Sequence, residues 1–234
     1  MESFKVTKKI ARLIVLQRIE IIGSFLKFVR KLFGRYLFTS FVTKFFLLRD
    51  QVGKKYYTIM YNEFLSFKEH INIKNYNIFL SIGGGVGGLE TIINNNFPDK
   101  KYYFIERNFV SKKVRYGWGG VFNSEAYNNI LDQKNFLLNN YMQSNQINIF
   151  DYDKDDLPKI KFDVIISLLS LDYHYDFDIY QKYLKEVSTP NTKIIFDTIR
   201  ADYFKNIFKN IKIIRSDMDT VHKSKRLICS EFLN

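Results

Sequence analysis

A cluster of glycines has the clearest chemical meaning in this chain. Residues 78–88 read IFLSIGGGVGG, so a run of strand length leads into glycines, and a helical pattern begins at Leu89. Glycine lacks a Cβ, so the backbone can turn sharply here and approach a ligand closely. The N–H groups that open the next helix then face that ligand. Two spacings fit, Gly83-x-Gly85-x-Gly87 and Gly83-x-Gly85-x-x-Gly88, and either predicts a nucleotide-like cofactor without identifying it.

Acidic residues follow the next two predicted strands. Residues 101–105 (KYYFI) form a strand pattern that ends at Glu106, 19 positions after Gly87. A carboxylate at this distance from a glycine loop is typical of one that accepts hydrogen bonds from a ribose. Residues 145–150 predict a third strand that leads into an acidic segment at the rim of the same site. Asp151 or Asp153 could accept from an adenine amino group there; the alternative is a solvated acidic turn, and we assign Asp151 to the cofactor.

A continuous apolar run, residues 162–169, predicts a buried parallel strand that ends in SLDYHY, residues 170–175. His174 is the natural general base there, because imidazole titrates near neutral pH. Asp172 could orient His174 or bind the acceptor. Other acidic residues follow, but no spacing among them is diagnostic of a metal site, so we expect none.

A glycine-rich insertion follows the second predicted strand. It holds Arg115 and the only tryptophan, Trp118, with glycines on both sides of that ring. Such a loop could stack on a sugar ring or close over the pocket; the alternative is an ordinary turn with an anchoring Trp. We assign Arg115, Trp118 and Tyr175 to the acceptor.

The elements that must position these residues occur in a familiar order. SIGGGVG, FIE and FDVIIS mark the ends of three strands, KIIFD (193–197) marks another, and residues 211–215 and 226–232 form two strands joined by a polar turn. Over residues 55–234 this order resembles the class I S-adenosylmethionine (SAM)-dependent methyltransferases. The resemblance implies an α/β fold with a doubly wound, mostly parallel seven-stranded Rossmann-like sheet. Its C-terminal antiparallel hairpin is not expected in a dehydrogenase, which favours SAM over a dinucleotide.

The resemblance also implies roles for individual residues. SAM would be held by the loop register Gly83, Gly85 and Gly87, with the further contacts Ser81, Glu106, Asp151 and Ser170. Ser81 departs from the family, which usually has an acidic residue two positions before the first glycine, so the strength or geometry of cofactor binding is expected to differ. A fainter likeness to polysaccharide-associated methyltransferases suggests a saccharide hydroxyl as the acceptor.

Residues 1–54 are predicted to form a separate basic helical extension. Eleven Lys and Arg against three acidic residues within positions 1–50 supply +8 of the net charge of +12. From Ile10 to Arg35 a helical projection separates apolar from basic side chains. Such a helix could pack on the domain or on a second subunit as a homo-oligomer. Alternatively, residues 10–48 could lie in an anionic membrane surface.

Composition limits the remaining possibilities. A single cysteine excludes an intramolecular disulfide and favours a cytoplasmic protein, peripheral at the inner face of the membrane if the extension binds lipid. The prediction is therefore a SAM-dependent methyltransferase, O-directed on a saccharide or lipid-linked glycan. The alternatives are an RNA methyltransferase that uses the basic segment, and a non-catalytic scaffold. Nucleic acid is less favoured because the apolar face lacks a polar, aromatic-interleaved groove, and a nicotinamide enzyme ranks last.

Overall fold

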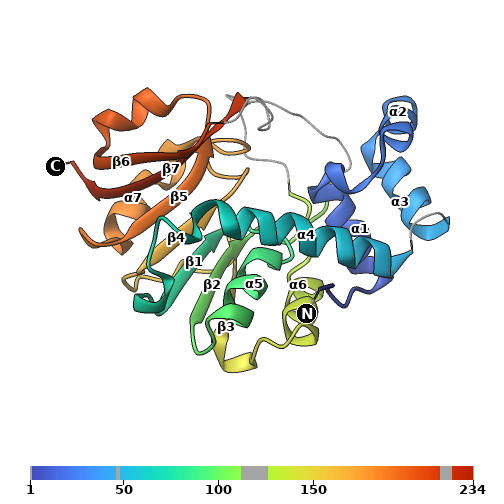
Figure 1. Ribbon diagram of the computed structural model, residues 1–234, viewed down its shortest axis with the longest axis horizontal. Coiled ribbons are helices and arrows are strands. Elements are labelled where there is room, and N and C mark those ends of the chain that lie inside the picture. The colour runs from blue at the N-terminus through green and yellow to red at the C-terminus, as the bar shows by residue number, and fades with distance from the viewer. Residues whose placement is uncertain (1, 46–47, 112–125, 217–222, 234) are drawn as a thin grey trace.

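The apolar runs form the strands of one sheet in a computed structural model, which describes residues 2–45, 48–111, 126–216 and 223–233 (Figure 1). The seven strands lie in the order β3-β2-β1-β4-β5-β7-β6. Their bounds are β1 Ile78–Ile82, β2 Lys101–Glu106, β3 Ile147–Asp151, β4 Val164–Ser167, β5 Lys193–Thr198, β6 Phe208–Arg215 and β7 Lys225–Phe232.

The strand directions confirm the predicted architecture. Strand β1 pairs in parallel with β2 and β4, and the outer pairs β2–β3 and β4–β5 are also parallel. Strand β7 is antiparallel to both of its neighbours, β5 and β6. The sheet is thus doubly wound and mostly parallel, with an antiparallel hairpin at its C-terminal end. The carboxyl ends of β1, β2 and β4 meet at one edge of the sheet, where such sheets bind ligands.

Alternate strand residues enter two different cores, because successive side chains point to opposite faces of a sheet. Phe79 of β1 joins the core beneath α4, α5 and α6, whereas Leu80 and Ile82 join the core beneath α7. The helices are α1 Lys8–Gln17, α2 Ser24–Phe33, α3 Arg35–Phe45, α4 Arg49–Lys68, α5 Gly88–Asn96, α6 Ile130–Asn139 and α7 Phe177–Val187, with 3-10 turns η1 Ile19–Ile21, η2 Ile73–Asn75, η3 Ser144–Gln146 and η4 Ala201–Asn206.

The N-terminal segment is divided into several short helices, unlike the continuous helix expected from Ile10 to Arg35. Thr7 caps α1 by accepting a hydrogen bond from the Ile10 N–H at 3.2 Å. The helix stops at Gln17, because Arg18 leaves helical geometry with φ −129° and ψ 88°. The apolar residues of α1 are buried in the core that also contains α4 and α6. Helix α4 crosses the predicted boundary at residue 55, which stays a prediction.

Helices α2 and α3 project from one end of the molecule, opposite β6 (Figure 1). Gly34 joins them and adopts φ 72°, a left-handed conformation that favours glycine. Phe38 and Val42 anchor α3, each only 2% exposed, whereas most large apolar residues of both helices face solvent. Within the described ranges, no helix has the length and apolar character needed to cross a membrane.

The start of the chain is clasped to a helix far along the sequence. The Lys5 N–H donates to Asn140 Oδ1 at 2.8 Å, and Asn140 Nδ2 donates to the Lys5 carbonyl at 3.0 Å. Beside this clasp, the Phe4 ring lies 5.2 Å from Phe136. The N-terminal segment is therefore integrated with the sheet domain through both polar and apolar contacts.

A buried charge network joins β5 and β7 to α4. Arg226, 2% exposed, donates to both oxygens of Asp197, at 2.8 and 3.0 Å. Its Nη1 also donates to Glu63 Oε2 of α4 at 2.5 Å. The Arg18 guanidinium lies 3.5 Å from the other oxygen of Glu63. Burial tends to raise the pKa of Glu63, but the opposing attraction of Arg226 and Arg18 prevails, and that pKa is lowered.

Candidate cofactor site

The glycine loop between β1 and α5 adopts the conformation that its residues predict. Gly83 and Gly85 have φ of 63° and 68°, in the left-handed region where a side chain would be strained. A Cβ at Gly83 would clash with Ser170 Oγ, and one at Gly85 would lie 2.5 Å from Gln17 Oε1. Gly88 instead begins α5, packed against the Tyr56 ring. The loop backbone therefore lies so close to Ser170 and Gln17 that a side chain at Gly83 or Gly85 would collide with them.

Glu106, at the end of β2, faces this loop. Its Oε1 accepts a hydrogen bond from the Gly85 N–H at 2.9 Å, and the residue is 5% exposed. Burial, the largest influence, raises the pKa of Glu106 to about 8; the Asn128 amide opposes this rise, and the nearby Glu90 carboxyl adds to it. Asn128 also donates to the Gly85 carbonyl at 2.9 Å. A buried carboxyl and a loop backbone therefore lie side by side, as the spacing of Glu106 predicts.

Ser81 lies behind the loop, beside a buried carboxyl of α5. Ser81 and Glu90 are 3% and 2% exposed, and a Cβ at Gly84 would meet both side chains. Neither Ser81 Oγ nor Glu90 Oε2 completes a hydrogen bond of normal geometry with another described group. Burial raises the pKa of Glu90, and the nearby Ser81 hydroxyl partly opposes that rise. An acidic group is thus present under the loop, although it comes from α5 instead of β1.

Gln17, the last residue of α1, connects the loop to the segment before α6. Its Nε2 donates to the Tyr127 carbonyl at 2.7 Å, and its Oε1 accepts from the Val86 N–H at 3.3 Å. The next residues, Arg18 and Glu20, line the same cleft. In the sequence, Gln17 and Arg18 are simply polar residues within the predicted amphipathic helix. No local pattern could show that Gln17 contacts the cofactor loop or that Arg18 lines the cleft.

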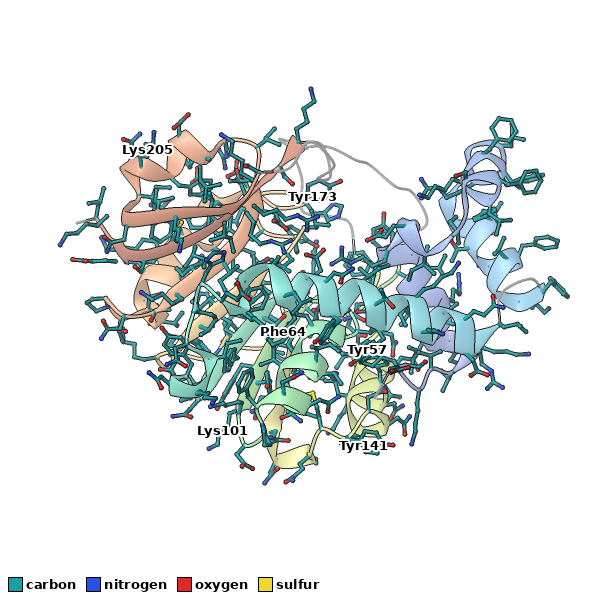
Figure 2. All side chains as sticks on the ribbon, in the orientation of Figure 1. Tyr57, Phe64, Lys101, Tyr141, Tyr173 and Lys205 are labelled. Carbon is teal, nitrogen blue, oxygen red and sulfur yellow. The ribbon has the colours of Figure 1, made fainter. Side chains whose placement is uncertain are left out.

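The segment after β4 forms a tight turn around Ser170. The Ser170 carbonyl accepts from the N–H groups of Tyr173 and His174, at 3.1 and 2.8 Å. His174 lines the cleft, and its ring lies edge-on to Tyr173 with centroids 4.6 Å apart. Figure 2 shows Tyr173 at the upper edge of the sheet. Ser170, His174 and Tyr175, three of the predicted residues, are therefore brought to the cleft.

Asp172 has different partners from those predicted. Its Oδ2 accepts from Thr198 Oγ1 at 2.6 Å, and its Oδ1 accepts from Arg200 Nε at 2.9 Å. The residue is 5% exposed, and it does not line the cleft formed by the described residues. These contacts tie the turn to β5 and the segment after it. The two predicted roles of Asp172, orienting His174 and binding the acceptor, stay predictions.

The remaining predicted residues lie at the rim or outside the described part. Asp151 is buried at the end of β3, where its N–H donates to Asp155 Oδ2 at 2.7 Å, and it is not among the described residues that line the cleft. Arg107 does line the cleft and pairs with Asp153 at 2.7 Å. Arg115 and Trp118 fall within residues 112–125, outside the described ranges.

Tyrosine is the most frequent residue type among the described residues that line the cleft, and we call these side chains the tyrosine wall. Burial raises the pKa of Tyr175 to about 12, and Arg107 opposes this rise. Tyrosines supply both aromatic faces and hydroxyl groups, so this wall can contact an apolar ring face and hydrogen-bond to polar groups on the same ligand. The tyrosines that line the cleft are Tyr56, Tyr127, Tyr173, Tyr175 and Tyr180.

Comparison with known proteins identifies the fold. Neither a family model nor a curated protein matches the sequence. Among solved structures, the SAM-dependent methyltransferase SibL in its apo form matches 92% of this chain with 9% identity and a TM-score of 0.51. The mitomycin 7-O-methyltransferase MmcR matches 86% of the chain with 13% identity and a TM-score of 0.50. The chain has the class I SAM-dependent methyltransferase fold.

The methyltransferase fold accounts for the unusual end of the sheet, where antiparallel β7 lies between β5 and β6. It also places the glycine loop after β1 and Glu106 at the end of β2, at the edge where the cleft opens. The chain spans 61% of SibL and 57% of MmcR, which is less than two thirds of either structure.

Proposed function

We propose that the protein is a SAM-dependent methyltransferase that methylates a hydroxyl of a saccharide or lipid-linked glycan at a membrane surface. The observation that carries the cofactor assignment is the hydrogen bond between Glu106 and Gly85 at the carboxyl ends of β1 and β2. It brings a carboxyl suited to ribose hydroxyls beside a backbone turn suited to the methionine part.

The hydrogen-bonding groups in the cleft fit SAM. Glu106 would hold the ribose, and the amides of the glycine loop would face the carboxylate of the methionine part. Glu90, buried behind Gly84, supplies acidic character near the position where Ser81 lacks it. The buried Glu106 carboxyl becomes less costly to ionise when hydroxyl donors and a cationic ligand approach it.

His174 is the group proposed to act on the acceptor. When bound, SAM supplies a methyl group on a sulfonium, whose sulfur departs as a neutral thioether. His174 takes the proton of the acceptor hydroxyl at an imidazole nitrogen, while the hydroxyl oxygen uses a lone pair to form the new bond to carbon. Ser170 holds the turn that presents His174 to the cleft. The remaining task of the protein is to align the acceptor with the methyl group.

The tyrosine wall supports a saccharide acceptor. Sugar rings have apolar faces and hydroxyl rims, and Tyr127, Tyr173 and Tyr175 offer matching aromatic faces and hydroxyls. The exposed apolar helices α2 and α3 support a membrane setting. Both parts of this assignment require tests separate from the test of the cofactor.

Titration calorimetry with SAM, S-adenosylhomocysteine (SAH) and NAD tests the cofactor assignment. We expect SAM and SAH to bind and NAD not to bind. Glu106→Gln should weaken SAH binding at least tenfold, because an amide accepts fewer hydrogen bonds than a carboxylate and carries no charge. Glu69→Gln, on an exposed turn after α4, is the matched control and should bind like the wild type. An absence of binding by both SAM and SAH would refute the proposed function.

A further inference from the structure

Large exposed apolar side chains lie on α2, on α3 and, in the case of Leu48, directly before α4. They have exposed fractions of 57% to 76%, although each is a large hydrophobic residue. Soluble monomers seldom expose a contiguous apolar surface of this kind unless it contacts a partner or a membrane. We call these side chains the α2–α3 face; it consists of Phe25, Phe28, Leu32, Phe33, Leu37, Phe41, Phe45 and Leu48.

The face is held in place by the opposite side of α3. Phe38 and Val42, both 2% exposed, pack into the core that contains the apolar residues of α1. The apolar residues of α1 are buried, so the exposed apolar surface begins only after residue 23. In Figure 1, α2 and α3 form one end of the molecule, and in Figure 2 their side chains project outward from it. The buried side of α3 therefore fixes the helix on the core, while its opposite side remains exposed to solvent.

The charged residues of the segment that carries this face have one sign. Positions 21–49 contain six Lys and Arg and no Asp or Glu. Basic and aromatic side chains lie side by side here, since Lys44 Nζ is 5.2 Å from the centre of the exposed Phe45 ring. Two copies packed through this segment would bring cations together without acidic partners from the same segment of either copy, which opposes association. An anionic lipid surface offers the complementary charge and an apolar layer for the rings.

We propose that the α2–α3 face docks the protein on a membrane surface that contains anionic lipid. The aromatic and leucine side chains enter the boundary between headgroups and acyl chains, and the Lys and Arg residues remain at headgroup level. This inference deepens the proposed function. It rests on that function for the reason why the protein would bind a membrane, namely to reach a lipid-linked acceptor. It differs from the predicted range of residues 10–48, because residues 10–22 belong mainly to the core.

The α2–α3 face begins close to the cleft in the chain. Glu20 lines the cleft, and α2 begins only four residues later, at Ser24. Four residues span at most roughly 14 Å. A docked α2 would therefore hold the cleft close to the lipid–water boundary, where the sugar of a lipid-linked acceptor lies.

Co-sedimentation of the whole chain with vesicles tests the proposal. We expect retention on vesicles of phosphatidylcholine mixed with phosphatidylglycerol, and much less on phosphatidylcholine alone or at high salt. The double variant Leu32→Gln/Leu37→Gln should lower the partition coefficient at least tenfold. Leu131→Gln is the matched control, because Leu131 of α6 is 68% exposed, like Leu37, and lies outside the face. Lys44→Gln should weaken retention, whereas Lys134→Gln on α6 should not.

Two further measurements keep the outcomes distinct. SAH calorimetry on the same preparations should give wild-type affinity for the Leu32/Leu37 variant, because the face does not line the cleft formed by the described residues. Loss of vesicle binding with intact SAH binding therefore separates docking from the proposed function. The proposal is overturned if the wild type ignores anionic vesicles, or if Leu131→Gln reduces retention equally. It is also overturned if sedimentation shows a dimer that the Leu32/Leu37 variant dissolves.

Discussion

Two buried carboxyls give the cofactor loop its electrostatic character. Glu106 and Glu90 are both at most 5% exposed, and the pKa of each is raised, mainly by burial. At neutral pH the Glu106 carboxyl of the unliganded protein is therefore largely protonated, and burial disfavours the ionisation of Glu90 as well. Neutral carboxyls fit a dry environment better than ionised ones do. The ionisation of these two residues should appear in the stability of the protein.

The thermal stability of the unliganded protein should fall as pH rises from 5 to 9. The Glu106 pKa is about 8 in the folded protein against an ordinary value of 4.5, so the folded state retains a proton that the unfolded state loses. That stabilisation is complete below pH 4.5 and disappears as pH passes 8. Each unit of pKa difference corresponds to about 1.4 kcal/mol, so the total is on the order of a few kcal/mol.

Calorimetric melting of wild type and Glu106→Gln at several pH values measures this effect. The variant should be less sensitive to pH across this range, whereas Glu69→Gln should follow the wild type. Parallel curves for wild type and Glu106→Gln would contradict the assignment of the proton to Glu106.

Ser81→Asp should destabilise the protein by about 1–3 kcal/mol, because it places a second carboxyl beside the buried Glu90. The double variant Ser81→Asp/Glu90→Gln returns the site to one carboxyl and should recover most of the loss. Denaturant unfolding of the four proteins in this cycle provides the measurement. Additive losses in the double variant would show that the two side chains do not interact.

Helix α1 is the element whose sequence pattern left the most alternatives open. Its apolar face was predicted to pack on the domain or on a second subunit, or to lie in a membrane surface. Its apolar residues are buried, and Gln17 at the end of the helix contacts the glycine loop. The partners of Gln17 lie 69 and 110 positions away in the chain. A helical projection shows that a face is apolar, but it cannot show what covers that face.

Gln17→Ala should weaken SAH binding roughly fivefold to tenfold, because each lost hydrogen bond costs about 1 kcal/mol and the loop loses its contact with the Tyr127 segment. Gln51→Ala on the exposed start of α4 is the matched control. Calorimetry gives the affinities, and melting in the absence of ligand shows whether the fold remains intact. Unchanged affinity for Gln17→Ala would mean that the loop holds its shape without this residue.

The strand ends, in contrast, were predictable. Glu106 and Ser170, two predicted cofactor contacts, each stand at or shortly after the end of an apolar run that the sequence predicts as a strand. The structure forms both strands, so both residues lie near the predicted edge of the sheet. The contacts of Asp172 with Thr198 and Arg200 depend on side chains from β5 and the segment after it. Such pairings require the three-dimensional arrangement of the strands, which no spacing in the sequence expresses.

At the scale of the whole molecule, the network of Arg226, Asp197 and Glu63 joins the antiparallel end of the sheet to α4 and, through Arg18, to the cleft. Removal of one buried partner leaves the others with unpaired charge. The network thus connects regions that the sheet alone does not join.

Arg226→Met should reduce stability by about 3–5 kcal/mol at neutral pH, because Asp197 and Glu63 lose their shared cation. The loss should be smaller at acid pH. Glu63 has a lowered pKa in the folded wild type, so its contribution is present above its ordinary value of 4.5 and is lost as pH falls through the folded pKa. Denaturant unfolding at several pH values tests this, with Lys225→Met on the exposed neighbouring position as the control. An equal loss at every pH would contradict the charge-based explanation.

The clasp between Lys5 and Asn140 affects the order in which the protein can fold. These residues are 135 positions apart, and Gln17 waits for Tyr127 in the same way. Contacts over such separations form late, because a long loop must close before they gain anything. During synthesis, Lys5 and Gln17 must therefore remain without these two partners until Tyr127 and Asn140 have left the ribosome. The cofactor loop can reach its final shape only after that delay.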